Sequence, residues 1–550
     1  MSNSGHVDIS HQHLSLFLTL PTSLTDKMPT ISEQLSDRLL NVYLESEYLL
    51  MPIFDAPVLR EHYKTFKTQK KPADHWTGAI INLCFALACL GPSAPRVPSA
   101  EAFYQHAQSL GPSLVALDNP VHSMQFHILQ VQYLIASGKL KLAWEVIACV
   151  LRTAQSHGMH TKSPILRAKY EDDTDLIQRL WHAIQILERS LALRLGVVAR
   201  TFDSSCNALL PSVRDTDWAE DVPGLETGDE KACSLLIDFF NATARLYSIS
   251  DDILELERDL RFPGSECPLE TIRKWDLDDF NKVEKELSDW KASLPRTLRI
   301  KCAEATGKTP NPVHSQLANI IRFRHRYLAF RLYRPLFILA QVLSVRCGFC
   351  SSDRSHMARD EEPSLNSPAV LGFIRAASSK CVLAAHCLLW DIGHDARTAP
   401  DLKFDDIPSL TCEVLDGRYT CGLVIIVSCA MKFNWMDHKQ WERHFDMPDM
   451  LRQQFLSWEQ NIRPAYMKMR ISRCVEAFAF FRDHFYDAWD PDKGIKNHGL
   501  PHSSWRNLCQ RLDLDWAWVE DPSLAVATPG FYEPIPFLPW MESLPVDFDD

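Results

Sequence analysis

Two stretches of the chain decide its fold: AWEVIACVLRTAQ from Ala143 to Gln155, and IQRLWHAIQILERSLALRLG from Ile177 to Gly196. Apolar residues recur every three or four positions in both stretches, which places them on one face of an α-helix. The first stretch is followed by Gly158 and the second ends on Gly196, and glycine commonly terminates a helix at such positions. The sequence therefore predicts two amphipathic helices joined by a loop.

The same helical spacing returns along most of the chain. Further helices are predicted over Leu235–Leu260, Phe280–Trp290, Leu317–Leu332, Val370–Trp390, Tyr419–Phe433 and Cys474–Trp489. Sustained alternation of apolar and polar residues, which marks a half-buried strand, is not found. Only 19 glycines occur in 550 residues, about half of the usual share, and this disfavours α/β folds with glycine-rich phosphate loops. We expect an all-α protein, a large multi-helix bundle or array.

Composition divides the chain into three parts. Residues 1–35 are polar and are expected to be disordered, residues 36–490 form the helical body with a disordered insertion at 346–368, and residues 491–550 form an acidic-aromatic C-terminal segment. After Arg511 the chain has no Lys or Arg and nine acidic residues among its aromatics. Such a segment suits transcriptional activation, in which a partner groove accepts the aromatics. A strap packed on the helical body is an equal alternative.

Charge and hydropathy limit the classes of partner and location. The formal net charge is −12, so the surface as a whole does not attract nucleic acid. The first eighty residues hold seven Lys and Arg against nine acidic residues, which provides no basic arm. Leu14–Leu20 lacks the flanks of a signal peptide, and Cys421–Met431 is shorter than the ~20 residues that span a bilayer. The 16 scattered cysteines are typical of a reduced protein, so we expect a soluble intracellular protein without a membrane segment.

The short motifs of catalysis and cofactor binding are absent. The sequence has no G-x-G-x-x-G, no G-x-x-x-x-G-K, no H-E-x-x-H and no G-x-S-x-G. Cys347 and Cys350 form a lone C-x-x-C pair, and neither His356 nor Cys381 stands at the spacing that would complete a zinc site. We assign no catalytic, cofactor-binding, metal or DNA-binding residue.

Charged clusters have structural explanations. The arginines of one segment spread around a helix axis, so solvent-facing or intramolecular ion-pairing roles are favoured over phosphate binding. They are Arg322, Arg324, Arg326, Arg331 and Arg334. Three acidic pairs are expected beside helix starts, where they complement the helix dipole. These are Asp172-Asp173, Asp251-Asp252 and Asp278-Asp279.

Several segments, taken in order, resemble landmarks of a known family. Tyr43–Tyr63, with Met51-Pro52-Ile53-Phe54, is similar to an opening helix followed by a hydrophobic turn, and His157-Gly158-Met159-His160 is similar to a Leu-Gly-Leu-His helix end. Arg179-Leu180-Trp181-His182 resembles an Arg-Arg-Leu-Trp-Trp helix, and Leu209-Leu210-Pro211 resembles the closing Leu-Pro. The chain departs from the pattern at His182, at Glu188 and at Val197-Val198. Farther on, Leu332-Tyr333-Arg334-Pro335 resembles a His-Arg-Pro sequence at the end of a long helix.

These landmarks together resemble the middle homology region of fungal transcription regulators, over residues 36 to 490. The resemblance implies an α-helical regulatory domain that acts through transcription-machinery partners, effector binding or dimers. The binuclear zinc cluster that usually precedes such a domain has six cysteines, whereas no cysteine occurs here before Cys84. Zinc is therefore expected only if an upstream cluster exists, and no cofactor is assigned to this chain.

The sequence thus predicts a fungal-type transcription regulator located in the nucleus, or in the nucleus and cytoplasm. It would reach DNA through a homo- or heterodimer with a DNA-binding regulator, or through an N-terminal cluster missing from the sequence. Control of a biosynthetic or nutrient-use pathway is what the resemblance implies. Two alternatives remain: a helical small-molecule sensor or scaffold without a chromatin role, and a helical enzyme without recognisable motifs.

Overall fold

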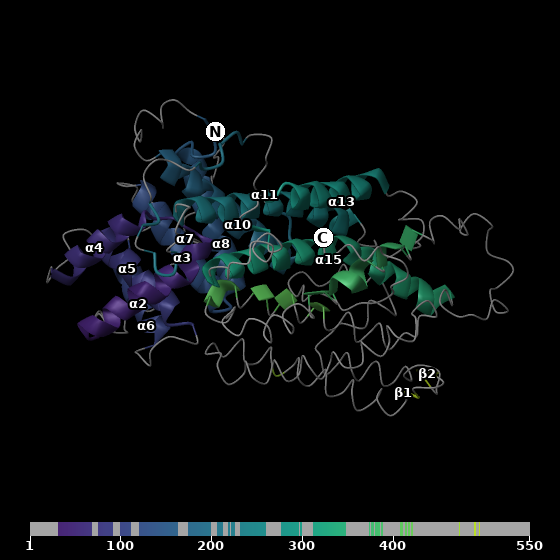
Figure 1. Cartoon of the computed structure of the whole chain (residues 1–550), viewed down its shortest axis with the longest axis horizontal. Helices are drawn as coiled ribbons and strands as arrows, with labels where there is room; N and C mark the ends of the chain where they lie inside the picture. Colours follow the sequence, from purple (N-terminus) through teal and green to yellow (C-terminus); the bar gives the residue numbers. More distant parts are fainter. Residues whose placement is uncertain are drawn as a thin grey trace, which may run out of the picture.

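The computed structural model describes residues 31–347 with gaps between helices, parts of residues 373–421, and a few positions beyond. The described part is almost entirely helical, as expected for an all-α protein (Figure 1). Its one sheet is a two-stranded antiparallel hairpin of β1 (Trp489–Asp490) and β2 (Gly494–Ile495). None of the described helices is long and apolar enough to cross a membrane.

The N-terminal helices form one end of the molecule. They are α2 (Glu33–Glu45), α3 (Glu47–Leu50), α4 (Ala56–Thr68), α5 (His75–Ala88), α6 (Ala100–Leu110), α7 (Pro120–Ala136) and α8 (Leu140–Ser156). Helix α7 lies at the centre of this end, in contact with α5, α8 and α10, and nearly all of its residues are buried. A helix that is buried all round needs partners for its polar side chains. The Gln125 amide accordingly donates to the Ile53 carbonyl at 2.8 Å.

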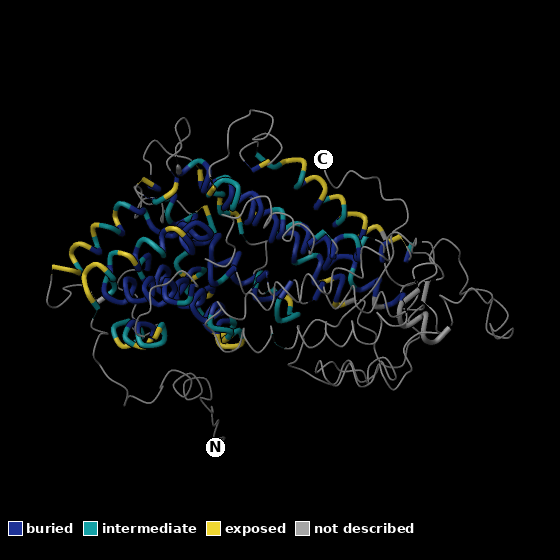
Figure 2. The backbone as a smooth tube through the Cα atoms, turned by 60° about the horizontal axis from the view of Figure 1, so that its bottom comes forward, coloured by how far each residue is buried: buried dark blue, intermediate teal, exposed yellow. Residues whose placement is uncertain are grey.

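The later helices are longer. They are α10 (Thr174–Leu195), α11 (Ala232–Asp259), α13 (Leu277–Ala292) and α15 (Pro312–Cys347). Helix α11 contacts α10, α13 and α15, and Figure 1 shows α11, α13 and α15 extending away from the N-terminal end. Buried residues run continuously from that end along these helices (Figure 2), so one hydrophobic core joins the two groups.

Glycine ends helix α8 as the sequence predicts. Gly158 has a φ of 71°, a left-handed conformation that favours glycine. Its N–H donates to the Gln155 carbonyl at 2.9 Å, and the Met159 N–H donates to the Ala154 carbonyl at 3.0 Å. This pair of bonds is a Schellman motif. Gly196, with a φ of 65°, follows the end of α10.

Two predictions about helix boundaries were wrong. The helix predicted over Leu317–Leu332 extends to Cys347 and contains Pro335 in its interior. A proline inside a helix costs a hydrogen bond, but Leu336 and Phe337 beside it are fully buried, and tertiary packing overrides the local stop signal. Asp251-Asp252 lie inside α11 rather than at a helix start, whereas Asp278 and Asp279 occupy the first turn of α13 as expected.

Other predictions lie outside the described residues or are covered in part. Residues 1–30, Asp172-Asp173, residues 348–368 of the predicted insertion and the tail after Arg511 are not described. Residues 422–433 and 474–488, which make up most of two predicted helices, also lie outside the described part. The described part of the chain starts at Ile31, and the Ser32 side chain caps α2, close to the start of the helical body predicted at residue 36. Described positions within Val370–Trp390 are helical from residue 373 to residue 388, with gaps.

Candidate functional site

The family-like landmarks of the sequence meet around one buried arginine. Arg179 of α10 is 1% exposed, and its Nη1 donates to the carbonyls of Pro52 at 2.6 Å and Phe54 at 3.0 Å. Its Nε pairs with Asp175 at 3.0 Å and its Nη2 pairs with Asp55. The guanidinium thus holds the Met51–Phe54 turn against α10.

The other landmarks are joined to the same helix. The His160 carbonyl accepts N–H bonds from Asn207 and Ala208 at 3.0 and 3.1 Å, and the His160 ring lies 5.8 Å from the ring of Trp181. His182 Nε2 lies 3.1 Å from the Leu209 carbonyl oxygen. The helix end, the Arg-Leu-Trp helix and the Leu-Pro turn therefore form one hydrogen-bonded unit.

A second buried polar region lies farther along the chain. Residues 407–421, called here the docked segment, are helical at every described position from 408 onward. Ser409, Glu413, Asp416 and Thr420 follow one another at spacings of four, three and four residues, which places them on one helix face. Each of these polar side chains has a hydrogen-bond partner in the protein.

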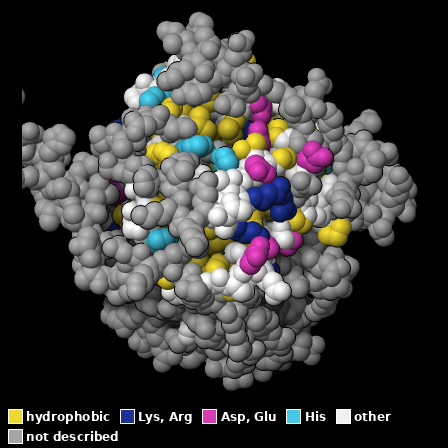
Figure 3. Space-filling model, turned by 90° about the vertical axis from the view of Figure 1, so that its left-hand side faces the viewer, with side chains coloured by type: hydrophobic (Ala, Val, Ile, Leu, Met, Phe, Trp, Pro, Cys, Tyr) yellow, Lys and Arg dark blue, Asp and Glu magenta, His cyan; other side chains and the backbone are white. Residues whose placement is uncertain are grey.

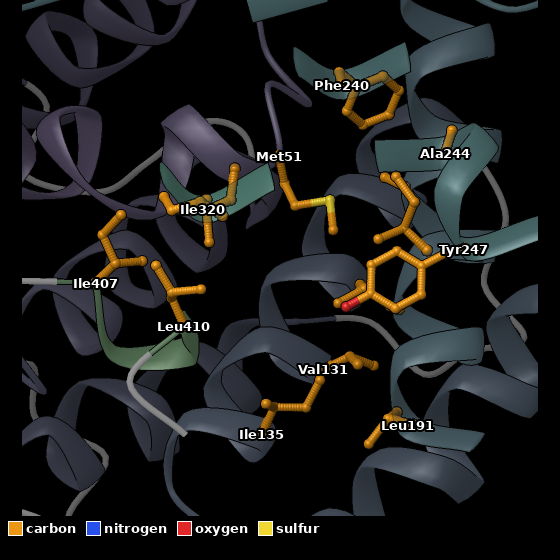
Figure 4. Packing of buried hydrophobic residues seen from close by; sticks show 14 of the residues in the cluster. Met51, Val131, Ile135, Leu191, Phe240, Ala244, Tyr247, Ile320, Ile407 and Leu410 are labelled. Carbon is orange, nitrogen blue, oxygen red and sulfur yellow. The ribbon is translucent and has the colours of Figure 1, made fainter. Parts of the chain in front are cut away.

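The apolar side of the docked segment is also buried. Ile407, Leu410 and Cys421 are 0% exposed, and Figure 4 shows Ile407 and Leu410 in the apolar cluster that includes Met51 and Ile320. At Gly417, a Cβ atom would lie 3.0 Å from the Phe323 ring of α15. The segment is thus packed tightly into the core.

Ser409 binds a buried carboxylate of α3. Glu47 is 1% exposed, and its two carboxylate oxygens accept the Ser409 N–H at 2.7 Å and the Ser409 hydroxyl at 2.5 Å. The Gln132 amide of α7 donates to the same carboxylate at 3.3 Å. Burial raises the pKa of Glu47 from 4.5 to about 7, opposed by the Ser409 hydrogen bonds and the positive charge of Arg324.

Glu413 forms the second contact. Its carboxylate pairs with Arg324 of α15, with Nε and Nη2 at 3.0 to 3.2 Å, and accepts the Tyr247 hydroxyl of α11 at 2.8 Å. Burial raises the pKa of Tyr247, and the Glu413 charge adds to the rise. The Arg324 guanidinium also lies 5.7 Å from the centroid of the Tyr247 ring, so a single charge network joins three helices.

Asp416 forms the third contact, with Arg194 of α10 at 2.6 Å. Both side chains are largely buried, at 4% exposure for Arg194 and 11% for Asp416. Removing one partner of a buried pair leaves an uncompensated charge, which is strongly destabilising. The three contacts therefore make docking of the segment specific for its polar residues as well as for its apolar ones.

The arginine cluster of α15 is largely internal. Arg324, Arg326 and Arg331 are buried, and Arg331 pairs with Glu257 at 2.5 Å while donating to the Leu193 carbonyl at 2.7 Å. Arg334 also pairs with Glu257, at 3.1 Å. Intramolecular ion pairing is thus confirmed for Arg324, Arg331 and Arg334, and a solvent-facing role is wrong for Arg324 and Arg331.

A metal site finds no support among the described residues. No group of three or more His, Cys, Asp or Glu side chains there could hold a metal ion. Cys381 is buried with its sulfur 3.9 Å from the Phe330 carbonyl, while Cys350 and His356 lie outside the described part. On the face shown in Figure 3, visible Lys and Arg side chains lie beside Asp and Glu side chains, so its described surface is mixed in charge.

Sequence reasoning missed Glu47, Ser409, Glu413 and Arg179 as organising residues. The signal at Glu47 was weak, because Glu45 and Ser46 also interrupt the apolar residues between Tyr43 and Met51. A charge within a buried helix requires a partner. Its partner comes 362 residues later, a separation that no local pattern reports.

Residues 40–292 match the fungal specific transcription factor domain. This part of the chain is similar to the domains of that family. The match covers the Arg179 contacts and ends before α15 and the docked segment begin. The resemblance seen in the sequence landmarks is thereby confirmed for this part of the chain.

Three curated proteins are similar to the chain over parts of their length. The Sorbicillinoid biosynthetic cluster transcription factor 2 of Penicillium rubens is 30% identical over 32% of this chain and 26% of that protein. Transcription factor FBD3 of Fusarium pseudograminearum is 23% identical over 59% of this chain and 43% of its own length. The uncharacterized transcriptional regulatory protein C530.05 of Schizosaccharomyces pombe is 22% identical over 33% and 24%. The chain aligns with less than half of each relative.

Proposed function

We propose that the protein is a fungal-type transcription regulator whose helical body positions a C-terminal activating segment. The match of residues 40–292 to the fungal specific transcription factor domain carries this proposal. The three relatives are named as transcription factors or a transcriptional regulatory protein, which supports a regulatory role over an enzymatic one. Control of a biosynthetic gene cluster is supported by the name of the Penicillium relative.

The activating segment is proposed from its sequence. Residues 512–550 carry nine acidic residues, no Lys or Arg, and aromatics that include Trp516 and Trp540. Acidic charges keep such aromatics solvated until a partner surface accepts them. We therefore propose a nuclear location and a partner surface in the transcription machinery with a hydrophobic groove and a basic rim.

DNA contact is proposed to come through another module. The formal net charge of −12 opposes non-specific attraction to phosphate. A dimer with a DNA-binding regulator, or a zinc cluster encoded upstream, would supply the contact. Zinc would belong to that cluster and to no residue named in the present chain.

A reporter assay tests the proposal. The whole chain is fused to a heterologous DNA-binding domain, with residues 512–550 present or deleted. We expect activation by the full chain and its loss on deletion. A matched variant that keeps the tail length but replaces the tail aromatics with serine separates side-chain chemistry from length, and reporter silence with the intact chain would contradict the activator role.

A further inference from the structure

We draw no further inference here: the strongest candidate, the cluster of buried polar side chains around Glu47 in which the side-chain oxygen of Gln132 and Arg324 Nη1 have no hydrogen-bond partner among the residues that the structure describes, carries nothing, because both atoms are enclosed by the packed core and nothing in the described residues shows a space that a ligand would occupy beside them.

Discussion

Replacing Arg179 with methionine should destabilise the protein severely. The substitution keeps an unbranched apolar side chain in α10 but removes every hydrogen bond of the guanidinium. The Pro52 carbonyl oxygen loses its Arg179 donor, the Phe54 carbonyl oxygen keeps only the Tyr48 hydroxyl as a donor, and the largely buried Asp175 loses its ion-pair partner.

The expected loss can be worked out from these groups. Each buried acceptor left without a partner costs about 1–3 kcal/mol, and breaking a buried ion pair by removing one partner costs about 3–5 kcal/mol. These contributions overlap because one side chain supplies them all, so we expect a total of about 4 kcal/mol. Arg179→Lys should recover only part of this loss, because one ammonium group cannot reach four partners in the guanidinium geometry.

Urea unfolding followed by circular dichroism measures the change in the free energy of unfolding. Arg152→Met provides the control, because Arg152 is an exposed arginine on α8 and its replacement should change stability by less than about 0.5 kcal/mol. If Arg179→Met costs less than about 1 kcal/mol, the Met51–Phe54 turn is held by other contacts and the central role of Arg179 is refuted.

Further predictions concern the core, a helix end and pH. Trp181→Ala should cost about 3–5 kcal/mol, because the side chain is fully buried, and a midpoint shift in urea below that of an exposed Leu142→Ala control would contradict this packing. Gly158→Ala should lower the thermal midpoint, because the φ of 71° at this residue costs an L-residue about 1 kcal/mol. Gly111→Ala tests steric overlap instead, because its Cβ atom would meet the Phe126 ring. Burial lowers the pKa of His127 from 6.5 to about 4, so the folded state favours the neutral imidazole. The free energy of unfolding should therefore fall by about 3 kcal/mol as the pH decreases from 6.5 to 4. Urea midpoints at pH 7 and pH 4.5 should converge in His127→Gln, and equal acid sensitivity in the variant and the parent would exclude this cause.

The fold class and the helices α8, α10, α11 and α13 could be predicted from apolar spacing, because each amphipathic face depends on residues three or four apart. Helices α8 and α10 were placed within a few residues by this spacing and by their terminal glycines. The continuation of α15 through Pro335 could not be predicted, since it depends on burial against helices distant in sequence. The same limitation hid the Ser409 contact, whose two partners are 362 residues apart.

The role of the α15 arginines could be predicted only in part from their spacing. Their angular spread on a helix disfavoured phosphate binding, and intramolecular pairing was confirmed for Arg324 and Arg331. Their burial was not foreseen, because the acidic partners Glu257 and Glu413 lie on other segments. A charge is placed inside a protein only by the tertiary contacts that neutralise it.

The position of residues 407–421 limits where a folded fragment of this protein can end. The family match stops at residue 292, yet Arg194 inside it pairs with Asp416. A fragment ending at residue 292 would expose the apolar side chains that α15 covers. It would also leave the buried Arg194 without the negative charge of Asp416. We therefore expect a soluble, folded fragment to extend beyond residue 421. The region that matches the family, residues 40–292, is then shorter than the part of the chain that we expect to fold as one unit.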